Sequence, residues 1–347
     1  MQQTKIKVNL SDLARCSLVP LYARMKISKE NSSLFNDAKA IKLVELIDYD
    51  FSAIEKSAVD YVLFTTVVGA MQFDNKIKTY ISEHPRASVV SLGAGFETEF
   101  YRVDNGTIHW YDLDLPEVIK VKKQLIPETD RVTYIAKSLL DPSWYQEIST
   151  EGCVFIIAAG LLRYFGEAEA RQLFLSLADH FPGCEIVFDA ESKLSNVFDG
   201  NFGAFGAGWS DDEPERRDAI QKELFKSFKN EWMIIPHDLK YKMLGVLITP
   251  TKPKSTEWKD IEIWWNQLSD QEKGKAMSNF ATFLCTPCKC PLENASEMTK
   301  WDDRITVSDQ FPLFKNIPRN SSLTRSVRQF MDYTDEKERI KIFHIRV

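Results

Sequence analysis

The sequence has no apolar run long enough to cross a membrane, and it has no strong excess of either charge. Its 347 residues include 44 lysines and arginines against 50 aspartates and glutamates, for a formal net charge of −6. A nucleic-acid-binding surface is usually strongly basic, so this balance argues against a nucleic-acid partner. Residues 1–16 also lack the apolar stretch of a secretory signal. We therefore expect a cytoplasmic protein that binds neither nucleic acid nor membrane.

Cysteine is scarce, since six in a chain of 347 residues do not make a disulfide scaffold. Three of them, Cys285, Cys288 and Cys290, lie close together and raise the question of a zinc site. A structural zinc site needs four ligands, and the sequence offers no second pair of cysteines or histidines at metal-binding spacing. We predict no metal, and the alternative roles of this cluster stay open.

Apolar residues are plentiful, at 44% of the chain, and their spacing changes along it. Residues 38–47 and 58–73 carry apolar side chains three and four positions apart, which predicts helices. From residue 88 onward short apolar runs alternate with helical stretches, which predicts an α/β fold with a parallel sheet and helices on both faces. The predicted strands are 88–94, 108–114, 132–138, 153–160, 185–192, 303–307 and 339–347. The predicted helices between the strands are 115–126, 142–149 and 166–181.

The alternation stops after about residue 200, which predicts a division of the chain. We expect four parts: an N-terminal helical region packed on the core (1–88), a Rossmann-like core (89–200), an insertion or cap (201–300) and the last strands of the core sheet (301–347). Residues 213–300 are predicted to form a helical cap over the carboxyl ends of the strands, because both ends of this segment are anchored to the sheet. Its aromatic residues either line an apolar substrate pocket or form the core of an accessory subdomain. The tryptophans of this segment and of the loop before it are Trp209, Trp232, Trp258, Trp264 and Trp265.

A glycine turn follows the first predicted strand of the core, and a carboxylate ends the second. In a doubly wound sheet ligands bind at the carboxyl ends of the strands, and glycine lets a ligand approach the backbone. Gly93-Ala94-Gly95 forms this turn, and Asp114 follows about 20 residues later, where an acid can bind the ribose hydroxyls of an adenosine. Asp112 shares its face, but Asp114 is nearer the turn. The alternative is that Asp114 only caps the following helix.

The phosphate-binding signatures are incomplete. A dinucleotide fold has a third glycine where this sequence has Thr98, and there is no lysine of the kind that binds a nucleoside triphosphate. S-adenosylmethionine is an adenosine ligand without a phosphate. The sequence therefore favours this cofactor.

Several stretches in the same order resemble the leucine carboxyl methyltransferase family, and most of all its tetracenomycin-type polyketide O-methyltransferase branch. They include LGAGFETEFYRVDNG, WYDLDLPEVI, IAKSLLDPSW, IIAAGLLRYF and HFPGCEIVFD. The resemblance covers about residues 17–200 and 301–347. It implies a class I S-adenosylmethionine-dependent methyltransferase fold, with a seven-stranded, mostly parallel sheet whose last strand is antiparallel. It also implies an O-methyltransferase that acts on a carboxylate or hydroxyl of a small-molecule acceptor.

The resemblance also implies a set of site residues. Arg24 is placed loosely as the basic residue that faces the methionine carboxylate, and the alternative is a solvated helix charge. Tyr164 follows the fourth strand where that strand opens on the cleft, so it is the candidate for hydrogen bonding to the acceptor, and the alternative is a packed aromatic side chain. The other candidates for cofactor binding are Gly93, Ala94, Gly95, Asp114, Leu115, Ser138, Leu139 and Ala159.

Two positions depart from the family pattern. Ala159-Gly160 stands where the family usually has Glu-Gly, and Gly69 stands where it usually has an arginine that pairs with the cofactor's carboxylate. Losing a charged hydrogen bond costs about 1.5–3 kcal/mol. Three hypotheses follow: a small-molecule O-methyltransferase, a protein C-terminal carboxyl methyltransferase, or a binding module that no longer binds the cofactor. Oligomeric state and acceptor identity are not predicted.

Overall fold

The computed structural model describes, besides isolated residues between 225 and 247, residues 5–52, 54, 60–150, 152–192, 249–270, 272–273, 276, 288–320, 323, 325–336 and 338–347. The chain forms two compact units. The first comprises Met1–Ala190, Leu292–Leu313 and Lys341–Val347, and the second comprises Glu191–Pro291 and Phe314–Ile340. The boundaries predicted from the sequence stay predictions.

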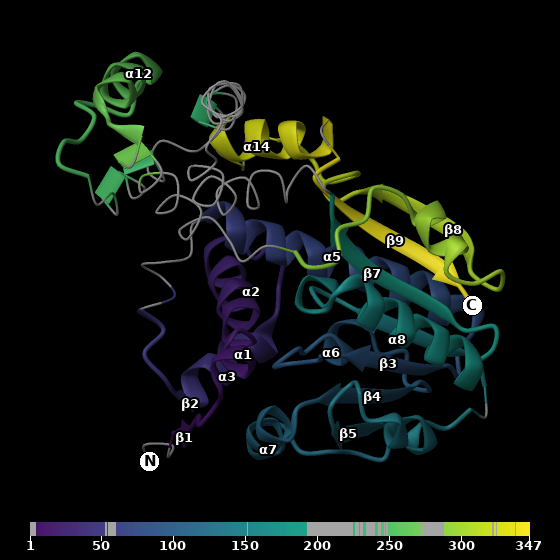
Figure 1. The fold of residues 1–347 in the computed structure, drawn as a ribbon. Coiled ribbons are helices and arrows are strands. Elements are labelled where there is room, and N and C mark those ends of the chain that lie inside the picture. The colour runs from purple at the N-terminus through teal and green to yellow at the C-terminus, as the bar shows by residue number, and fades with distance from the viewer. Residues whose placement is uncertain are drawn as a thin grey trace. The chain divides into compact units, whose positions relative to one another are not determined.

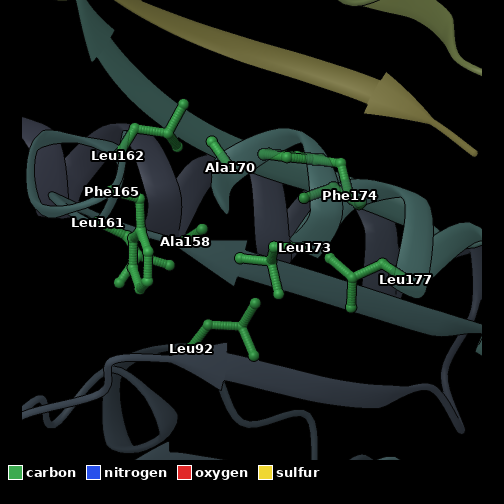
Figure 2. Close-up of a pocket in the computed structure, with 10 residues that line it drawn as sticks. Leu92, Ala158, Leu161, Leu162, Phe165, Ala170, Leu173, Phe174 and Leu177 are labelled. Carbon is green, nitrogen blue, oxygen red and sulfur yellow. The ribbon is translucent and has the colours of Figure 1, made fainter. Parts of the chain in front are cut away.

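The first unit is built on a seven-stranded sheet in the order β5-β4-β3-β6-β7-β9-β8 (Figure 1). The pairs β5–β4, β4–β3, β3–β6 and β6–β7 are parallel, and β8–β9 is antiparallel. Figure 2 shows the yellow strand β9 running opposite to the teal strands beside it, so the predicted seven-stranded, mostly parallel sheet is confirmed. The strands are β3 (Ser88–Leu92), β4 (His109–Asp114), β5 (Val132–Ala136), β6 (Val154–Ala158), β7 (Glu185–Glu191), β8 (Thr306–Pro312) and β9 (Ile340–Arg346).

Helices cover both faces of this sheet because the side chains of each strand alternate between them. On one face, the Tyr80 ring of α5 (Asp60–Glu83) stacks on Phe155 of β6, with 4.4 Å between the ring centroids. On the other face, α8 (Glu167–His180) packs its Phe174 against Phe188 of β7. The remaining helices that follow β3 in the sheet region are α6 (Phe100–Val103), α7 (Pro116–Leu125), η1 (Pro142–Glu147), η2 (Leu162–Tyr164) and η3 (Ala295–Lys300).

The N-terminal region forms a helical layer with its own apolar core. It contains α1 (Asp12–Arg15), α2 (Leu18–Glu30) and α3 (Ala38–Leu46), and its core is completed by Val118 and Val121 of α7. Strand β1 (Ile6–Lys7) pairs in parallel with β2 (Ile47–Asp48). This two-stranded sheet is not predicted by the sequence, because two residues are too short to show a periodicity.

The second unit contains α12 (Trp258–Gln267) and α14 (Arg325–Glu336). Trp264 and Trp265 are both buried. The indole N–H groups of Trp264 and Trp232 donate to backbone carbonyls within the unit, each at 2.8 Å. These contacts are those of a subdomain core. That the segment caps the strands of the first unit stays a prediction, and Trp209 lies outside the described residues.

The structure also bears on membrane spans, on the cysteine cluster and on metal ligands. No helix in the described ranges has the length and hydropathy of a membrane span. Cys288 and Cys290 are buried, whereas Cys285 lies outside the described residues. The described part of the chain contains no group of three metal-ligating side chains.

A buried ion pair fixes β4 to α7. Lys122 Nζ lies 2.7 Å from Asp112 Oδ2, and the two side chains are only 1% and 6% exposed. The other oxygen, Asp112 Oδ1, accepts a hydrogen bond from Trp110 Nε1 at 2.8 Å. The carboxylate of Asp112 is therefore occupied within the protein and is not available to a ligand.

Replacing Lys122 with methionine should destabilise the first unit, because it leaves the Asp112 carboxylate buried without its cation. The expected loss is about 3–5 kcal/mol in the free energy of unfolding, measured by urea denaturation. The matched control is Lys123→Met, which removes an exposed ion pair to Glu128 at 2.9 Å and should cost less than about 1 kcal/mol. Equal losses in the two variants would contradict a structural role for the buried pair.

Candidate functional site

The turn after β3 requires glycine at two positions. Gly93 and Gly95 have φ angles of +64° and +47°, in the left-handed region that other residues rarely adopt. A Cβ on Gly93 would lie 3.0 Å from Leu161 Cδ1, and a Cβ on Gly95 would lie 2.9 Å from Ser17 Cβ. The backbone conformation therefore disfavours a side chain at both positions, and Ser17 also crowds the position of Gly95. The structure places Ala94 between them as a buried residue.

Asp114 binds this turn directly. Its Oδ2 accepts a hydrogen bond from Gly95 N–H at 2.6 Å, and its Oδ1 accepts one from Leu115 N–H at 2.6 Å. Burial raises the pKa of Asp114, and the two N–H donors oppose that shift. Leu115 is the N-cap residue of α7, so Asp114 does not occupy the capping position. The carboxylate joins the end of β4 to the glycine turn.

The residues after β5 lie beside Asp114. Lys137 N–H donates to the carbonyl of Asp114 at 3.1 Å, which brings Ser138 and Leu139 to this edge of the sheet. Ser138 is exposed, and its Oγ accepts a hydrogen bond from Leu140 N–H at 3.2 Å. The hydroxyl proton of Ser138 remains available as a donor. Leu139 is half-buried, and its carbonyl accepts a hydrogen bond from Trp144 Nε1 at 3.3 Å.

The loop after β6 contacts a carboxylate of β7 that the sequence did not identify as a site residue. Ala159 is exposed, and Gly160 has a φ angle of +63°. Gly160 N–H donates to Asp189 Oδ1 at 2.5 Å, and burial raises the pKa of Asp189. The sequence feature that could have identified Asp189 is its position as an acid near the carboxyl end of the predicted strand 185–192. Asp189 thus brings a carboxyl group to the loop in which Ala159 replaces the expected glutamate.

The apolar side chains of the β6 loop point into the core. Figure 2 shows Leu161 and Phe165 near Ala158, on the side of the sheet that α8 covers. The space that they enclose with α8 is a cavity of about 10 Å³ with apolar walls. A cavity this small and apolar does not hold an ordered water. It belongs to the packing that supports the loop and is not a ligand site.

Arg24 is not a solvated helix charge, and this alternative is wrong. Its side chain is 1% exposed, and all three guanidinium nitrogens have partners. Nε donates to Asp37 Oδ2 at 3.1 Å, and Nη2 donates to the carbonyl of Phe96 at 2.9 Å. Nη1 pairs with Glu97. Arg24 therefore supports the backbone just after Gly95.

Asp37 is the centre of a buried network around Arg24. Its Oδ2 also accepts hydrogen bonds from Arg102 Nη1 at 2.9 Å and from the Thr98 hydroxyl at 2.5 Å. Arg102 in turn makes a bidentate pair with Asp74 at 2.8 and 2.9 Å. Thr98 stands at the third glycine position of a dinucleotide fold, and here its side chain is a member of this network.

Acids outnumber bases in this network, and the carboxylates differ in their surroundings. Burial raises the pKa of Asp37, but Arg24, Arg102 and their neighbouring donors outweigh it and leave that pKa below its ordinary value. Burial and the charge of Asp74 raise the pKa of Glu99. Among the described residues, Glu97 Oε2 has no hydrogen-bond partner although it is buried, and it lies 3.7 Å from Arg102 Nη2. One buried acceptor is therefore left beside the glycine turn.

The N-terminal segment Ser11–Ser17 covers the carboxyl ends of the strands. Ser17 lies against Gly95, and the Ser11 hydroxyl donates to Glu117 Oε1 at 2.5 Å. Tyr164, on η2, is half-buried and hydrogen-bonds Cys16, and burial raises its pKa. Tyr164 thus lies at the expected edge of the sheet. Its contact with the acceptor stays a prediction.

Gly69 lies on α5, in open space. A Cβ at this position would meet no atom within 4 Å. A glycine inside a helix costs roughly 1 kcal/mol relative to alanine, so the residue is not explained by crowding or by helix stability. The helix therefore has room for a β-carbon here.

Comparison with known proteins agrees with this geometry. The family described as Leucine carboxyl methyltransferase matches residues 22–178. The tetracenomycin polyketide synthesis O-methyltransferase TcmP of Streptomyces glaucescens is 29% identical over 184 residues, which span 53% of this chain and 67% of TcmP. These matches support the family and the branch that the sequence predicts.

Solved structures resemble the chain more distantly. A putative methyltransferase from Thermobifida fusca YX has a TM-score of 0.47 at 9% identity, and the match covers 96% of each chain. PKMT2 from Rickettsia typhi, solved in complex with AdoHcy, has a TM-score of 0.41 at 13% identity, over 75% of this chain and 48% of its own. The family assignment therefore rests on the sequence matches, and the fold rests on the strand order.

Asp37→Asn should destabilise the fold at neutral pH, because two buried guanidinium groups lose their shared carboxylate. The expected loss is roughly 3–5 kcal/mol in the free energy of unfolding. The pKa of Asp37 in the folded state lies below its ordinary 3.8. The ionised carboxylate therefore contributes fully to the free energy of unfolding above pH 3.8, and this contribution is lost as the pH falls through the folded-state pKa. Urea denaturation should therefore show that the difference in the free energy of unfolding between wild type and variant becomes smaller below about pH 3.8.

The control for this series is Asp12→Asn, which removes a carboxylate whose side chain is 98% exposed. This substitution should change the free energy of unfolding little at any pH, because exposed ion pairs contribute little to it. A difference between wild type and Asp37→Asn that stays constant into the acid range would show that charge pairing at Asp37 is not what stabilises the network.

Proposed function

The leucine carboxyl methyltransferase family matches residues 22–178, and from this match we propose that the chain is an S-adenosylmethionine-dependent O-methyltransferase of small molecules. The observation that carries the proposal is the pair formed by the glycine turn and Asp114, joined by the 2.6 Å hydrogen bond from Gly95. The family and the fold make the chain a methyltransferase. The acceptor class is the part that we infer.

The adenosine end of the cofactor fits the edge formed by β3, β4 and β5. Each oxygen of Asp114 accepts one backbone N–H, so each keeps a lone pair for a ribose hydroxyl. Ser138 offers a hydroxyl donor next to it, where the resemblance places the adenine. Gly93 and Gly95 leave the turn without side chains. These residues would hold a nucleoside that carries no phosphate.

The charge of the site suits the methionine end of the cofactor. S-adenosylmethionine supplies an electrophilic methyl group on a sulfonium, and its amino acid end carries an ammonium and a carboxylate. The buried Glu97 Oε2 accepts no hydrogen bond, although it lies 3.7 Å from Arg102 Nη2, and it would accept one from the ammonium. Arg24 donates three of its five N–H groups to the protein, and its side chain is 1% exposed, so the carboxylate would reach the two remaining N–H groups only after a local rearrangement. In that case Arg24 would compensate in part for the missing arginine at Gly69.

Methyl transfer is an in-line displacement that depends on alignment and on the exclusion of water. Ser11–Ser17 covers the carboxyl ends of β3 and β4 and would shield the reacting atoms. An ionised carboxylate acceptor needs no general base, whereas a phenol benefits from one. Tyr164 would position either acceptor through its hydroxyl, which now hydrogen-bonds Cys16.

Two observations bear on the acceptor. The relative TcmP is named as an O-methyltransferase of polyketide synthesis, which supports a small molecule. The family name supports a protein C-terminal carboxylate as the second candidate. The deciding assay measures transfer of labelled methyl from S-adenosylmethionine to aromatic carboxylic acids and phenols, and in parallel to a peptide ending in leucine. Transfer to the peptide alone would overturn the small-molecule proposal.

Asp114→Ala should weaken cofactor binding, because it removes the ribose acceptor and frees the glycine turn. We expect the dissociation constant for S-adenosylmethionine to rise by a factor of about 10–150, which corresponds to about 1.5–3 kcal/mol. Isothermal titration calorimetry measures it directly. The control Asp130→Ala removes an exposed carboxylate on a turn and should leave the constant unchanged. A folded Asp114→Ala protein with wild-type affinity would refute the assigned role.

Gly69→Arg should strengthen cofactor binding, because the helix has open space there and a guanidinium can pair with the cofactor's carboxylate. The gain of one charged hydrogen bond corresponds to about 1.5–3 kcal/mol. The control Gly69→Gln adds a shorter polar side chain without the charge and should bind as the wild type does. If the two variants bind equally well, the position does not face the methionine end.

A further inference from the structure

A cleft outside the glycine turn has the size of a small-molecule site. It lies between α3, α5 and α6, and its volume is about 560 Å³. Ligand pockets usually measure about 300–1,000 Å³. The residues that line it include neither Gly93, Gly95 nor Asp114. This cleft is therefore distinct from the site assigned above.

The carboxylates at the floor of the cleft are already occupied. Asp74 and Asp37 both line it. Arg102 binds both oxygens of Asp74, at 2.8 and 2.9 Å. Asp37 Oδ1 accepts from Ala40 N–H at 2.8 Å, and its Oδ2 accepts from Arg102 and other donors. Neither acid is left to attract a cation.

Lysines supply the uncompensated charge of the cleft. Lys39 and Lys42 come from α3, and Lys78 comes from α5. Lys42 and Lys78 are exposed, and no ion pair involves any of the three lysines within the ranges that the structure describes. The chain as a whole carries a net charge of −6, so three unpaired lysines around one cavity make a local positive potential against that background.

The cleft also offers an aromatic and an apolar surface. Tyr101 is 40% exposed, and the ammonium of Lys39 lies 4.2 Å from the centroid of its ring. Phe35 and Met71 line the same cavity. A ligand that matches all of these groups has an apolar, planar body and at least one negative charge.

We propose that this cleft, defined by Lys39, Lys42, Lys78 and Tyr101, binds an aromatic carboxylate. The carboxylate lies among the three ammonium groups, and the ring packs on Tyr101 and the apolar wall. Arg102 forms part of the floor and also belongs to the network that supports Phe96 and Glu97. The cleft is thus connected to the glycine turn through side chains that are already in contact.

The experiment uses the full chain without cofactor and titrates it with 2-naphthoate by isothermal titration calorimetry. The wild type should bind saturably, and the neutral isostere 2-naphthylmethanol should bind at least about tenfold more weakly. A variant with Lys39→Gln, Lys42→Gln and Lys78→Gln should lose about tenfold or more in affinity for 2-naphthoate. The matched control is a variant with Lys120→Gln, Lys259→Gln and Lys300→Gln, which changes the net charge equally at exposed sites and should bind as the wild type does.

Three results would overturn the proposal. The first is no binding of 2-naphthoate to the wild type. The second is unchanged affinity in the variant of the three cleft lysines, because the probe would then occupy another site such as the acceptor pocket. The third is an equal loss in the matched control, because the effect would then come from net charge alone. Circular dichroism of each variant confirms that the fold is retained.

Discussion

The pairing of Arg24 with Asp37 is the contact on which the candidate site depends. Both side chains are 1% exposed, and a buried charge is tolerated only when it is paired and hydrogen-bonded. Through this pair the N-terminal helices reach the backbone of Phe96, directly after the glycine turn. Arg102 extends the same network to α5 through Asp74. The turn is thus held by elements on several sides before any ligand arrives.

This construction explains why the glycine turn does not need a third glycine. In a dinucleotide fold that glycine allows the helix to pack closely on the strand. Here Thr98 occupies the position, and its hydroxyl reaches Asp37 at 2.5 Å. The turn and the backbone beside it are stabilised by side-chain hydrogen bonds, including those of Arg24 and Asp114. The same features that depart from a dinucleotide site suit a nucleoside ligand without phosphate.

The local parts of the site could be predicted from the sequence, whereas its long-range partners could not. Gly93, Gly95 and Asp114 lie at strand ends that the apolar pattern identifies, so their proximity follows from the parallel sheet. Arg24 has partners 13 and 73 positions away, and no periodicity connects them. The sequence pattern of α2 is therefore also compatible with a solvated Arg24, and only the structure shows that this side chain is buried. Asp189 was missed for a related reason, because its partner Gly160 belongs to a loop 29 positions earlier.

The central claim is that the glycine turn and Asp114 form a site for S-adenosylmethionine despite Gly69 and Ala159. Isothermal titration of the wild-type chain with S-adenosylmethionine tests it most directly. The account predicts saturable binding of one cofactor per chain. Absence of binding near millimolar cofactor would contradict it, and would indicate that the chain keeps the fold of the family as a binding module without its methyl donor.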